Sequence, residues 1–273
     1  MGNFSGTVTF ITGASSGIGA ALAREVAQQG GNVVLTARRL DRLESLATEI
    51  EEMGRRALAV GCDVTSDDDL EQAVAKTIEM FGRIDYVIAN AGFAVAGRFE
   101  NLTIDDHRRQ FETNVFGVLR TIQATCQHLI KSRGCLAIVG TVNSYMGLPL
   151  LSSYAMSKFA MHGLADSLRY ELRPHGVSVI FIVPGFIETE LRRVNRQGIY
   201  QPDAKDRIPR WLRLPAGKAA RQIAKALLRR KREKIITFHA IAAVFLQRHI
   251  PGLVYMLVSR FGLKSRRSGN GKL

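Results

Sequence analysis

The first 29 residues constrain the fold most, because an apolar run, a glycine-rich loop and a helix-type segment follow one another without a break. Thr7–Thr12 (TVTFIT) has the β-branched, apolar composition of a buried strand, and Ala20–Gln29 has that of a helix. Between them lies Gly13–Gly19 (GASSGIG). Strand, glycine loop and helix in this order are typical of a phosphate-binding turn, in which backbone N–H groups and the helix N-terminus face the anion.

The glycines of this loop have separate expected tasks. Gly13 allows the tight turn, Gly17 lets backbone N–H groups approach a pyrophosphate, and Gly19 permits close packing of the helix. The spacing is TGxxxGxG rather than the GxGxxG of the older dinucleotide fingerprint. An ordinary glycine turn is the alternative, but its place between strand and helix favours cofactor binding. The other expected contacts from this loop are Ser15, Ser16 and Ile18.

A second apolar run, Asn32–Ala37, ends in two arginines, Arg38 and Arg39. A site selective for NAD places a carboxylate near this strand end, where it accepts a hydrogen bond from the ribose 2′-OH. Here no carboxylate is present, and the planar donor fork of arginine suits a phosphate. We therefore predict NADP(H) as the cofactor. The alternative is two solvated arginines that lead into a polar helix.

Strand-type and helix-type segments alternate along the rest of the chain. The further expected strands are Ala57–Cys62, Ile84–Ala89, Leu136–Val139, Val177–Val183 and Lys234–Phe238, and the expected helices are Leu40–Met53, Asp67–Gly82, residues 100–130 and Lys218–Arg232. This alternation predicts an α/β fold with a Rossmann-type, doubly wound parallel sheet of seven strands and helices on both faces. Ligands then lie at the carboxyl ends of the strands.

Polar and small residues follow several of these strands. Asp63, beside Val64, could accept from an adenine amino group, but it could equally form a turn with the Thr and Ser that follow. The small-residue turn Asn90, Ala91, Gly92 offers a surface against which a flat cofactor could lie. These residues extend the predicted nucleotide site across the sheet edge.

The segment YAMSK places Tyr154 and Lys158 four residues apart, on one face of a helix. A phenol ordinarily loses its proton near pH 10. We expect the lysine cation to lower the pKa of Tyr154, which would make it a general acid–base near pH 7. On this pair alone an ordinary helix surface is the simpler interpretation. The glycine loop favours a catalytic pair.

Five motifs follow one another along the chain: TGASSGIG (12–19), NAG (90–92), Asn114, YAMSK (154–158) and PGFIET (184–189). In this order and spacing the chain resembles the short-chain dehydrogenases/reductases over roughly residues 5–190. The TARR sequence after the second strand resembles the NADP-preferring branch, which includes hydroxysteroid and 3-ketosphinganine reductases.

The resemblance implies roles for individual residues. Tyr154 would protonate a carbonyl oxygen while hydride arrives from the nicotinamide, and Lys158 would hold the nicotinamide ribose and lower the tyrosine pKa. Asn114, otherwise interpreted as a buried amide that stabilises the fold, would fix a water in a proton relay to Lys158. In the motif that begins with Pro184 and Gly185, the Ile187 backbone and the Thr189 hydroxyl would hold the carboxamide.

One position departs from the family pattern. The family normally has a serine thirteen residues before the tyrosine, where this chain has Thr141. Ser144 fits the role only if the loop is shorter. Thr141 keeps a hydroxyl donor and adds a methyl group that restricts its rotamers, so we favour it over Ser144.

The C-terminal quarter carries the excess charge. Residues 205–273 hold 18 basic and 2 acidic side chains, whereas residues 1–204 hold 20 and 22. We expect a catalytic domain over residues 1–240, a substrate lid at about residues 190–217, and a basic, apolar extension over residues 241–273. The extension either contacts an anionic membrane surface or packs on the domain or a second subunit. Without a recognised module, nucleic-acid binding is not expected.

The cysteine and histidine content limits the possible locations and reaction types. Three cysteines without a CxxC, together with the absence of a visible signal peptide, indicate the cytoplasm, and scattered histidines predict no catalytic metal. We expect a homo-oligomer, a dimer or tetramer. Two hypotheses result: an NADPH-dependent enzyme that interconverts an apolar, lipid-like ketone (or a carrier-bound 3-oxoacyl group) and its alcohol, or a cofactor-sensing or scaffolding protein without turnover. The tyrosine, lysine and asparagine together favour the enzyme.

Overall fold

The computed structural model describes residues 3–261 except 202, 205 and 207. Its strands are β1 (Val8–Thr12), β2 (Asn32–Ala37), β3 (Ala57–Gly61), β4 (Tyr86–Ala89), β5 (Cys135–Val139), β6 (Ser178–Pro184) and β7 (Glu233–Ile236). Its α-helices are α1 (Gly17–Gln28), α2 (Leu40–Glu52), α3 (Asp67–Phe81), α4 (Ile104–Phe111), α5 (Gly117–Ser132), α6 (Ser152–Leu172), α7 (Ala216–Leu228), α8 (Phe238–His249) and α9 (Pro251–Phe261).

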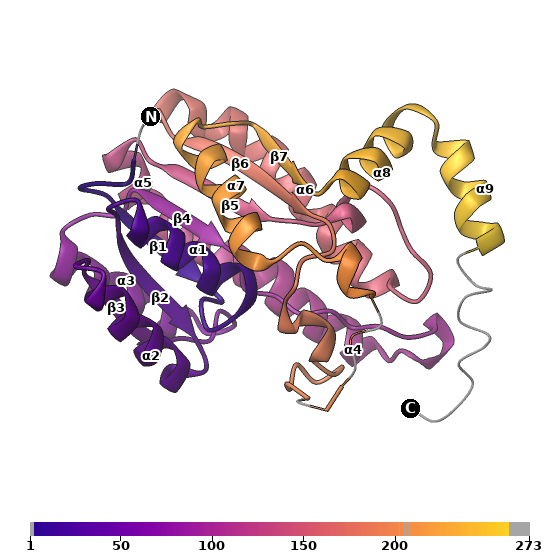
Figure 1. Cartoon of the computed structure of the whole chain (residues 1–273), viewed down its shortest axis with the longest axis horizontal. Helices are drawn as coiled ribbons and strands as arrows, with labels where there is room; N and C mark the ends of the chain where they lie inside the picture. Colours follow the sequence, from indigo (N-terminus) through magenta and orange to yellow (C-terminus); the bar gives the residue numbers. More distant parts are fainter. Residues whose placement is uncertain (1–2, 202, 205, 207, 262–273) are drawn as a thin grey trace.

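The seven strands form one parallel sheet in the order β3-β2-β1-β4-β5-β6-β7. The order reverses direction between β1 and β4, which is the switch point where ligands bind in open α/β sheets. Figure 1 shows the sheet between two layers of helices. The predicted doubly wound fold is confirmed, and the predicted strand and helix ends differ from the observed ones by a few residues.

Two apolar cores lie on opposite faces of the sheet. One contains buried residues of α1, α2 and α7, and the other contains buried residues of α3, α5 and α6. Successive strand residues alternate between them: Val33 and Leu35 of β2 belong to the first core and Val34 to the second. Because both faces are covered, the strands are continuously apolar rather than alternating.

The segment expected as one helix over residues 100–130 is helical from Ile104 to Ser132, but a π turn interrupts it. A capping box at Thr103 starts α4, and a π turn over Glu112–Phe116 separates it from α5. Asn114 lies within this turn, where the Gly117 N–H donates to the Glu112 carbonyl. A π turn inserts one extra residue into a helix and occurs often at functional sites.

The chain after β6 crosses the carboxyl edge of the sheet before it returns to form α7 and β7. Short 3₁₀ turns cover Glu190–Arg193 and Arg210–Leu212, and isolated bridges pair Ile187 with Leu214 and Val194 with Tyr200. This stretch, together with the described residues between its two turns, is the segment that was predicted as a lid. The expected domain boundary after residue 240 falls inside α8.

The two C-terminal helices, α8 and α9, stand at the end of the molecule away from β2 and β3 (Figure 1). No single helix among the described residues has the length and hydropathy to cross a membrane. Phe238–His249 and Pro251–Arg260 meet that criterion only as a pair, and the pair is bent by 118° at its break.

Phe181 offers a test of the core. Its side chain is fully buried in β6 and packs on the rings of Tyr145 and His162. We expect Phe181→Ala to lower the free energy of unfolding by about 3–5 kcal/mol, because a cavity replaces the ring. Urea denaturation measures this. The control Phe99→Ala, at a side chain 71% exposed, should change it by less than about 0.5 kcal/mol. Equal effects of the two substitutions would contradict the observed packing.

Candidate active site

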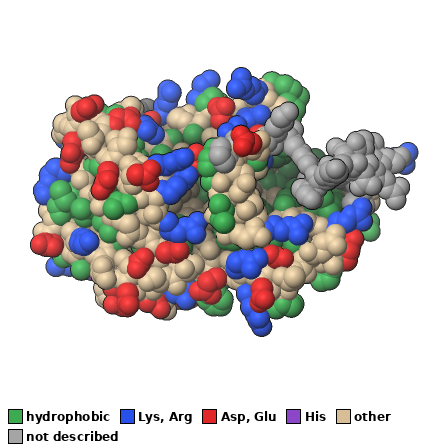
Figure 2. Space-filling view, turned by 90° about the horizontal axis from the view of Figure 1, so that it is seen from below, with side chains coloured by type: hydrophobic (Ala, Val, Ile, Leu, Met, Phe, Trp, Pro, Cys, Tyr) green, Lys and Arg blue, Asp and Glu red, His purple; other side chains and the backbone are tan. Residues whose placement is uncertain are grey.

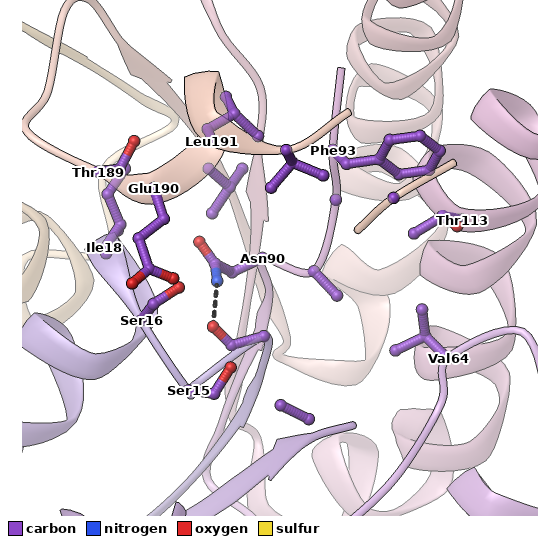
Figure 3. A pocket seen from close by; sticks show the side chains of 18 of the residues that line it. Ser15, Ser16, Ile18, Val64, Asn90, Phe93, Thr113, Thr189, Glu190 and Leu191 are labelled. Carbon is purple, nitrogen blue, oxygen red and sulfur yellow. Dashed lines mark hydrogen bonds between the residues drawn. The ribbon is translucent and has the colours of Figure 1, made fainter. Parts of the chain in front are cut away.

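A cavity of about 500 Å³ lies at the carboxyl edge of the sheet. The glycine loop forms one wall, and segments after β2, β3, β4, β5 and β6 form the others. In Figure 3, Ser15, Ser16 and Ile18 lie on one side, with Val64 and Thr113 across from them and Asn90 between. Figure 2 shows Lys and Arg side chains gathered across the middle of one face of the molecule. The predicted cofactor and catalytic residues that line the cavity are Gly13, Ser15, Ser16, Gly17, Ile18, Arg38, Arg39, Asp63, Val64, Asn90, Ala91, Gly92, Thr141, Tyr154, Lys158, Pro184, Gly185, Ile187 and Thr189.

The glycine loop is packed too closely for side chains. Gly13 has a φ of +67°, and a Cβ there would lie 2.9 Å from the Ala91 Cα. A Cβ on Gly19 would lie 2.5 Å from the Gly13 carbonyl oxygen. The Asn90 amide donates to the Thr12 and Gly13 carbonyl oxygens at 2.9 and 3.2 Å. Asn90 therefore holds the loop against the end of β4, and the loop presents backbone rather than side chains.

The start of α1 faces the same cavity. Gly17 has a φ of +56°, and a Cβ there would lie 3.1 Å from the Thr189 side chain. Ser16 is the N-cap residue, but its hydroxyl does not cap the helix and instead accepts a hydrogen bond from Arg39 at 3.0 Å. The free N–H groups at this end of α1 are suited to an anionic ligand.

The two predicted phosphate-binding arginines take different positions. The Arg38 side chain is 64% exposed, donates to the Gly198 carbonyl oxygen at 3.2 Å and lies 4.0 Å from the Asp63 carboxylate. Arg39 instead turns toward the glycine loop, where it donates to Ser15 at 3.0 and 3.2 Å. Arg38 is thus the more available guanidinium at the end of β2.

Glu190 is a residue of this site that sequence reasoning missed. Its carboxylate accepts from Arg39 at 2.9 Å and from Arg42 at 2.8 Å. Burial raises the pKa of the Glu190 carboxyl, but the hydrogen bonds from Arg42 and Arg39 outweigh it and hold the pKa below its usual value. The Tyr200 ring lies 6.0 and 5.6 Å from these two guanidinium groups. Glu190 therefore connects the segment after β6 to Arg39 and Arg42 at the start of α2.

Asp63 forms the turn that was one of its two expected roles. Its carboxylate accepts from the Thr65 backbone N–H at 3.0 Å and from the Thr65 hydroxyl at 2.9 Å. The following Ser66 caps α3 through a bond from Asp69. Because Asp63 and Val64 also line the cavity, the turn role does not remove them from the nucleotide site.

Asn114 is completely buried. Its Oδ1 accepts from the Phe93 N–H, and its Nδ2 donates to the Phe93 carbonyl oxygen and the Ser157 hydroxyl, each at 3.1 Å. A Cβ on Gly92 would lie 2.9 Å from this oxygen and 3.7 Å from the Lys158 Nζ. The asparagine thus joins the segment after β4 to α6. The water-fixing role implied for it by the resemblance stays a prediction.

Lys158 projects from α6 to the end of β5. Its Nζ donates to the Val139 carbonyl oxygen at 3.0 Å and lies 5.8 Å from the centre of the Tyr154 ring. The side chain is buried, and burial lowers the pKa of Lys158 from 10.5 to about 8. The helical spacing therefore places the amine and the phenol together, as predicted.

The expected lowering of the Tyr154 pKa is wrong for this structure. Burial raises the pKa of Tyr154 to about 12, and a hydrogen bond with Thr141 and the charge of Arg192 only partly oppose that effect. Removal of the phenolate from water outweighs the nearby cations. The phenol is therefore protonated at neutral pH.

Thr141 and Ser144 occupy different environments. Thr141 lines the cavity, and its side chain hydrogen-bonds with Tyr154. Ser144 is fully buried behind it, in the turn Val142–Ser144, and its hydroxyl accepts from the Thr141 backbone N–H at 3.2 Å. The geometry places the threonine, not the serine, beside the phenol.

The segment after β6 closes the site. The Arg192 guanidinium, which sequence reasoning did not assign, donates to the Ile187 carbonyl oxygen at 2.9 Å and to the Asp206 carboxylate at 2.8 Å. A Cβ on Gly185 would lie 2.2 Å from the Thr237 hydroxyl and 2.5 Å from the His239 Nε2. This wall of the cavity is therefore in direct contact with the first turn of α8.

These features fit a nicotinamide dinucleotide. The glycine cradle that admits no Cβ and the open end of α1 suit a pyrophosphate, and the tyrosine–lysine pair lies at the end of β5 in the same cavity. Fold and site together define a dinucleotide-binding α/β protein with a tyrosine–lysine pair in its cavity. The family model described as short chain dehydrogenase matches residues 7–199. The chain belongs to the short-chain dehydrogenase/reductase family.

Curated relatives support this assignment. The chain is 38% identical over 186 residues to the uncharacterized oxidoreductase YxnA of Bacillus subtilis. The aligned residues are 67% of this chain and 52% of that protein. It is 33% identical over 235 residues to 11-beta-hydroxysteroid dehydrogenase A of Arachis hypogaea, or 83% of this chain and 67% of that protein. The chain thus spans about half the length of the first of these relatives.

Solved structures share the fold. An alcohol dehydrogenase from the archaeon Thermococcus sibiricus, complexed with 5-hydroxy-NADP, superposes with a TM-score of 0.74 at 29% identity and covers 84% of this chain and 95% of its own. A short-chain dehydrogenase/reductase from Burkholderia phymatum, in complex with NAD, has a TM-score of 0.82 and covers 93% and 97%. At 22% identity the second supports the fold alone.

The lysine pKa can be measured directly. We expect the Lys158 amine to titrate near pH 8, because burial disfavours its charged form; it is protonated below that pH and neutral above it. Heteronuclear NMR of a lysine-labelled chain across pH 6–11 follows this change. The control Lys158→Met identifies the resonance by removing it. A Lys158 midpoint at the 10.5 of an ordinary lysine would contradict the observed burial.

Proposed function

We propose that this protein is an NADP(H)-dependent oxidoreductase that reduces the carbonyl of an apolar ketone to a secondary alcohol. The observation that carries the proposal is the buried pair of Tyr154 and Lys158 in the same cavity as the glycine loop. A proton donor and a dinucleotide site are the two things that such a reduction requires. Family membership and the relatives' names support the same reaction class.

Several groups would hold the cofactor. The loop from Gly13 to Gly19 would take the pyrophosphate on its backbone, and Arg38 would pair with the 2′-phosphate of the adenine ribose. Ile187 and Thr189, which line the cavity after β6, would hold the carboxamide. The bound nicotinamide supplies hydride to the carbonyl carbon.

The chain's own residues supply the proton for the reduction. The Tyr154 phenol donates its proton to the carbonyl oxygen, while Thr141 holds that oxygen in place. Lys158, anchored on the Val139 carbonyl oxygen, keeps a positive charge beside the phenolate that remains. Since burial raises the pKa of Tyr154 to about 12, the phenol is a donor at neutral pH, which favours the direction of reduction.

The substrate class is proposed from the walls of the cavity. Phe93, Leu191 and Val194 line it with apolar side chains on the side of the lid. An apolar ketone buries against them without leaving an unpaired polar group. The hydroxysteroid dehydrogenases among the relatives agree with such a substrate.

Turnover separates this proposal from the hypothesis of a cofactor-sensing protein, which only the threonine at position 141 favours. We expect Tyr154→Phe to reduce NADPH-dependent ketone reduction at least about 100-fold, because the proton donor is lost. NADPH absorbance with a panel of apolar ketones measures it. NADPH binding, followed by calorimetry, should persist.

Two matched hydroxyl deletions serve as controls. Thr141→Ala should slow the reaction strongly, whereas Ser144→Ala, outside the cavity, should leave most of it. Tight NADPH binding without turnover of any ketone by the unchanged protein would instead favour the sensor.

Cofactor preference depends on Arg38. We expect Arg38→Ala to raise the dissociation constant of NADPH about tenfold or more and that of NADH little, because only NADPH carries the 2′-phosphate. Titration of the intrinsic fluorescence gives both constants. Arg55→Ala, at an exposed arginine away from the cavity, is the matched control and should change neither. Equal weakening of both cofactors would refute the phosphate contact.

A further inference from the structure

The helices α8 and α9, here called the C-terminal arm, expose an unusual amount of apolar surface. Phe245 is 58% exposed and Tyr255 is 77% exposed. The other large apolar side chains exposed on or between these two helices are Phe238, Ile241, Ile250, Met256 and Leu257. Isolated apolar side chains on a surface are ordinary, but many large ones on two adjacent helices mark an interaction site.

The exposed residues of α8 share one face. Phe238, Ile241 and Phe245 follow the helical spacing of three and four residues, whereas Ala240 and Val244 between them are buried against the domain. Small residues therefore attach the helix, and large ones point outward. This is the reverse of an ordinary surface helix, whose large apolar residues face the core.

Polar contacts hold α8 at its first turn. The Thr237 hydroxyl caps the helix by accepting from the Ala240 N–H. His239 accepts from the Phe186 backbone N–H at 3.0 Å through its Nε2, and the two rings stack at 5.0 Å. This end of the arm is therefore fixed to the wall of the cavity.

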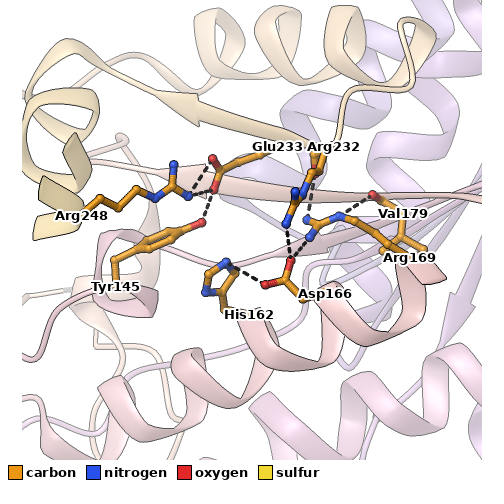
Figure 4. A network of polar contacts seen from close by, with 8 residues as sticks. All are labelled: Tyr145, His162, Asp166, Arg169, Val179, Arg232, Glu233 and Arg248. Carbon is orange, nitrogen blue, oxygen red and sulfur yellow. Dashed lines mark hydrogen bonds and ion pairs between the residues drawn. The ribbon is translucent and has the colours of Figure 1, made fainter. Parts of the chain in front are cut away.

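Further contacts hold the last turn of α8. Arg248 pairs with the Glu233 carboxylate at 2.9 and 3.0 Å, and its guanidinium lies 4.8 Å from the centre of the Tyr145 ring. The Tyr145 hydroxyl donates to the same carboxylate (Figure 4). With both ends fixed, α8 cannot rotate to bury its phenylalanines against the domain.

The positive charge of the C-terminal residues indicates which kind of apolar partner the arm binds. Residues 234–273 contain seven Lys and Arg side chains and no Asp or Glu. An apolar face within a wholly cationic segment suits the interface of a membrane that contains anionic lipids. Two copies of the arm would instead bring like charges together.

We propose that the C-terminal arm docks in the interface of an anionic lipid bilayer without crossing it. The apolar face of α8 and the exposed apolar side chains of α9 enter the acyl boundary, and Arg260 remains at the headgroups. The bend of 118° between the helices fits an arm that lies in one leaflet. Because α8 follows the carboxyl end of β7, docking also brings the sheet edge that holds the cavity toward the lipid.

Vesicle sedimentation tests the proposal with the full chain. The unchanged protein should sediment with vesicles of phosphatidylglycerol and phosphatidylcholine, bind phosphatidylcholine alone weakly, and dissociate as salt is added. Phe245→Glu combined with Met256→Glu should weaken the partition at least about tenfold, because two exposed apolar contacts become anionic. Circular dichroism and NADPH binding should not change.

The matched control is Tyr170→Glu. Tyr170 is 72% exposed near the end of α6, away from the arm, and its substitution should leave vesicle binding intact. Failure of the unchanged protein to bind either vesicle would overturn the proposal, as would equal losses in the arm and control variants. Loss of a dimer in the double variant with vesicle binding retained would assign the arm to a second copy. Tighter binding to short duplex DNA than to vesicles would also overturn it.

Discussion

A buried cation beside a buried phenol is the arrangement on which the rest of the site depends. Removal of the Lys158 ammonium from water is costly, and the Val139 carbonyl oxygen at 3.0 Å returns only part of that cost. A mobile loop could not hold the lysine and the tyrosine in this buried position. The lysine therefore extends from a long helix to the end of a central strand, and both elements are fixed by the two apolar cores.

The same parallel sheet explains why the fold was predictable. Continuous apolar strands alternating with amphipathic helices permit few other topologies, and the glycine loop identified the first strand–helix unit. The contacts of Gly13 and Gly19 leave no room for a Cβ at those positions. Local spacing was also sufficient to bring Tyr154 and Lys158 together, because a helix fixes the direction of side chains four residues apart.

What the sequence did not predict depends on contacts between distant segments. Glu190 lies about 150 residues from its partners Arg39 and Arg42, so no local pattern links them. The π turn at Asn114 coincides with hydrogen bonds from its amide to Phe93 and Ser157, which lie far from it in the sequence. The Tyr154 pKa is raised rather than lowered, because burial has a larger effect on it than nearby positive charge.

The cavity that holds Tyr154 and Lys158 is connected to the C-terminal arm through one stretch of backbone. Residues after β6 line the cavity, and Phe186 donates its N–H to His239 at the start of α8. A non-glycine residue, Thr237, holds a φ of +83° at this junction, a conformation that persists only when its surroundings impose it. Its hydroxyl caps α8 and lies against the site where a Cβ on Gly185 would be. Direct contacts of Thr237 and His239 therefore join the arm to the cavity wall.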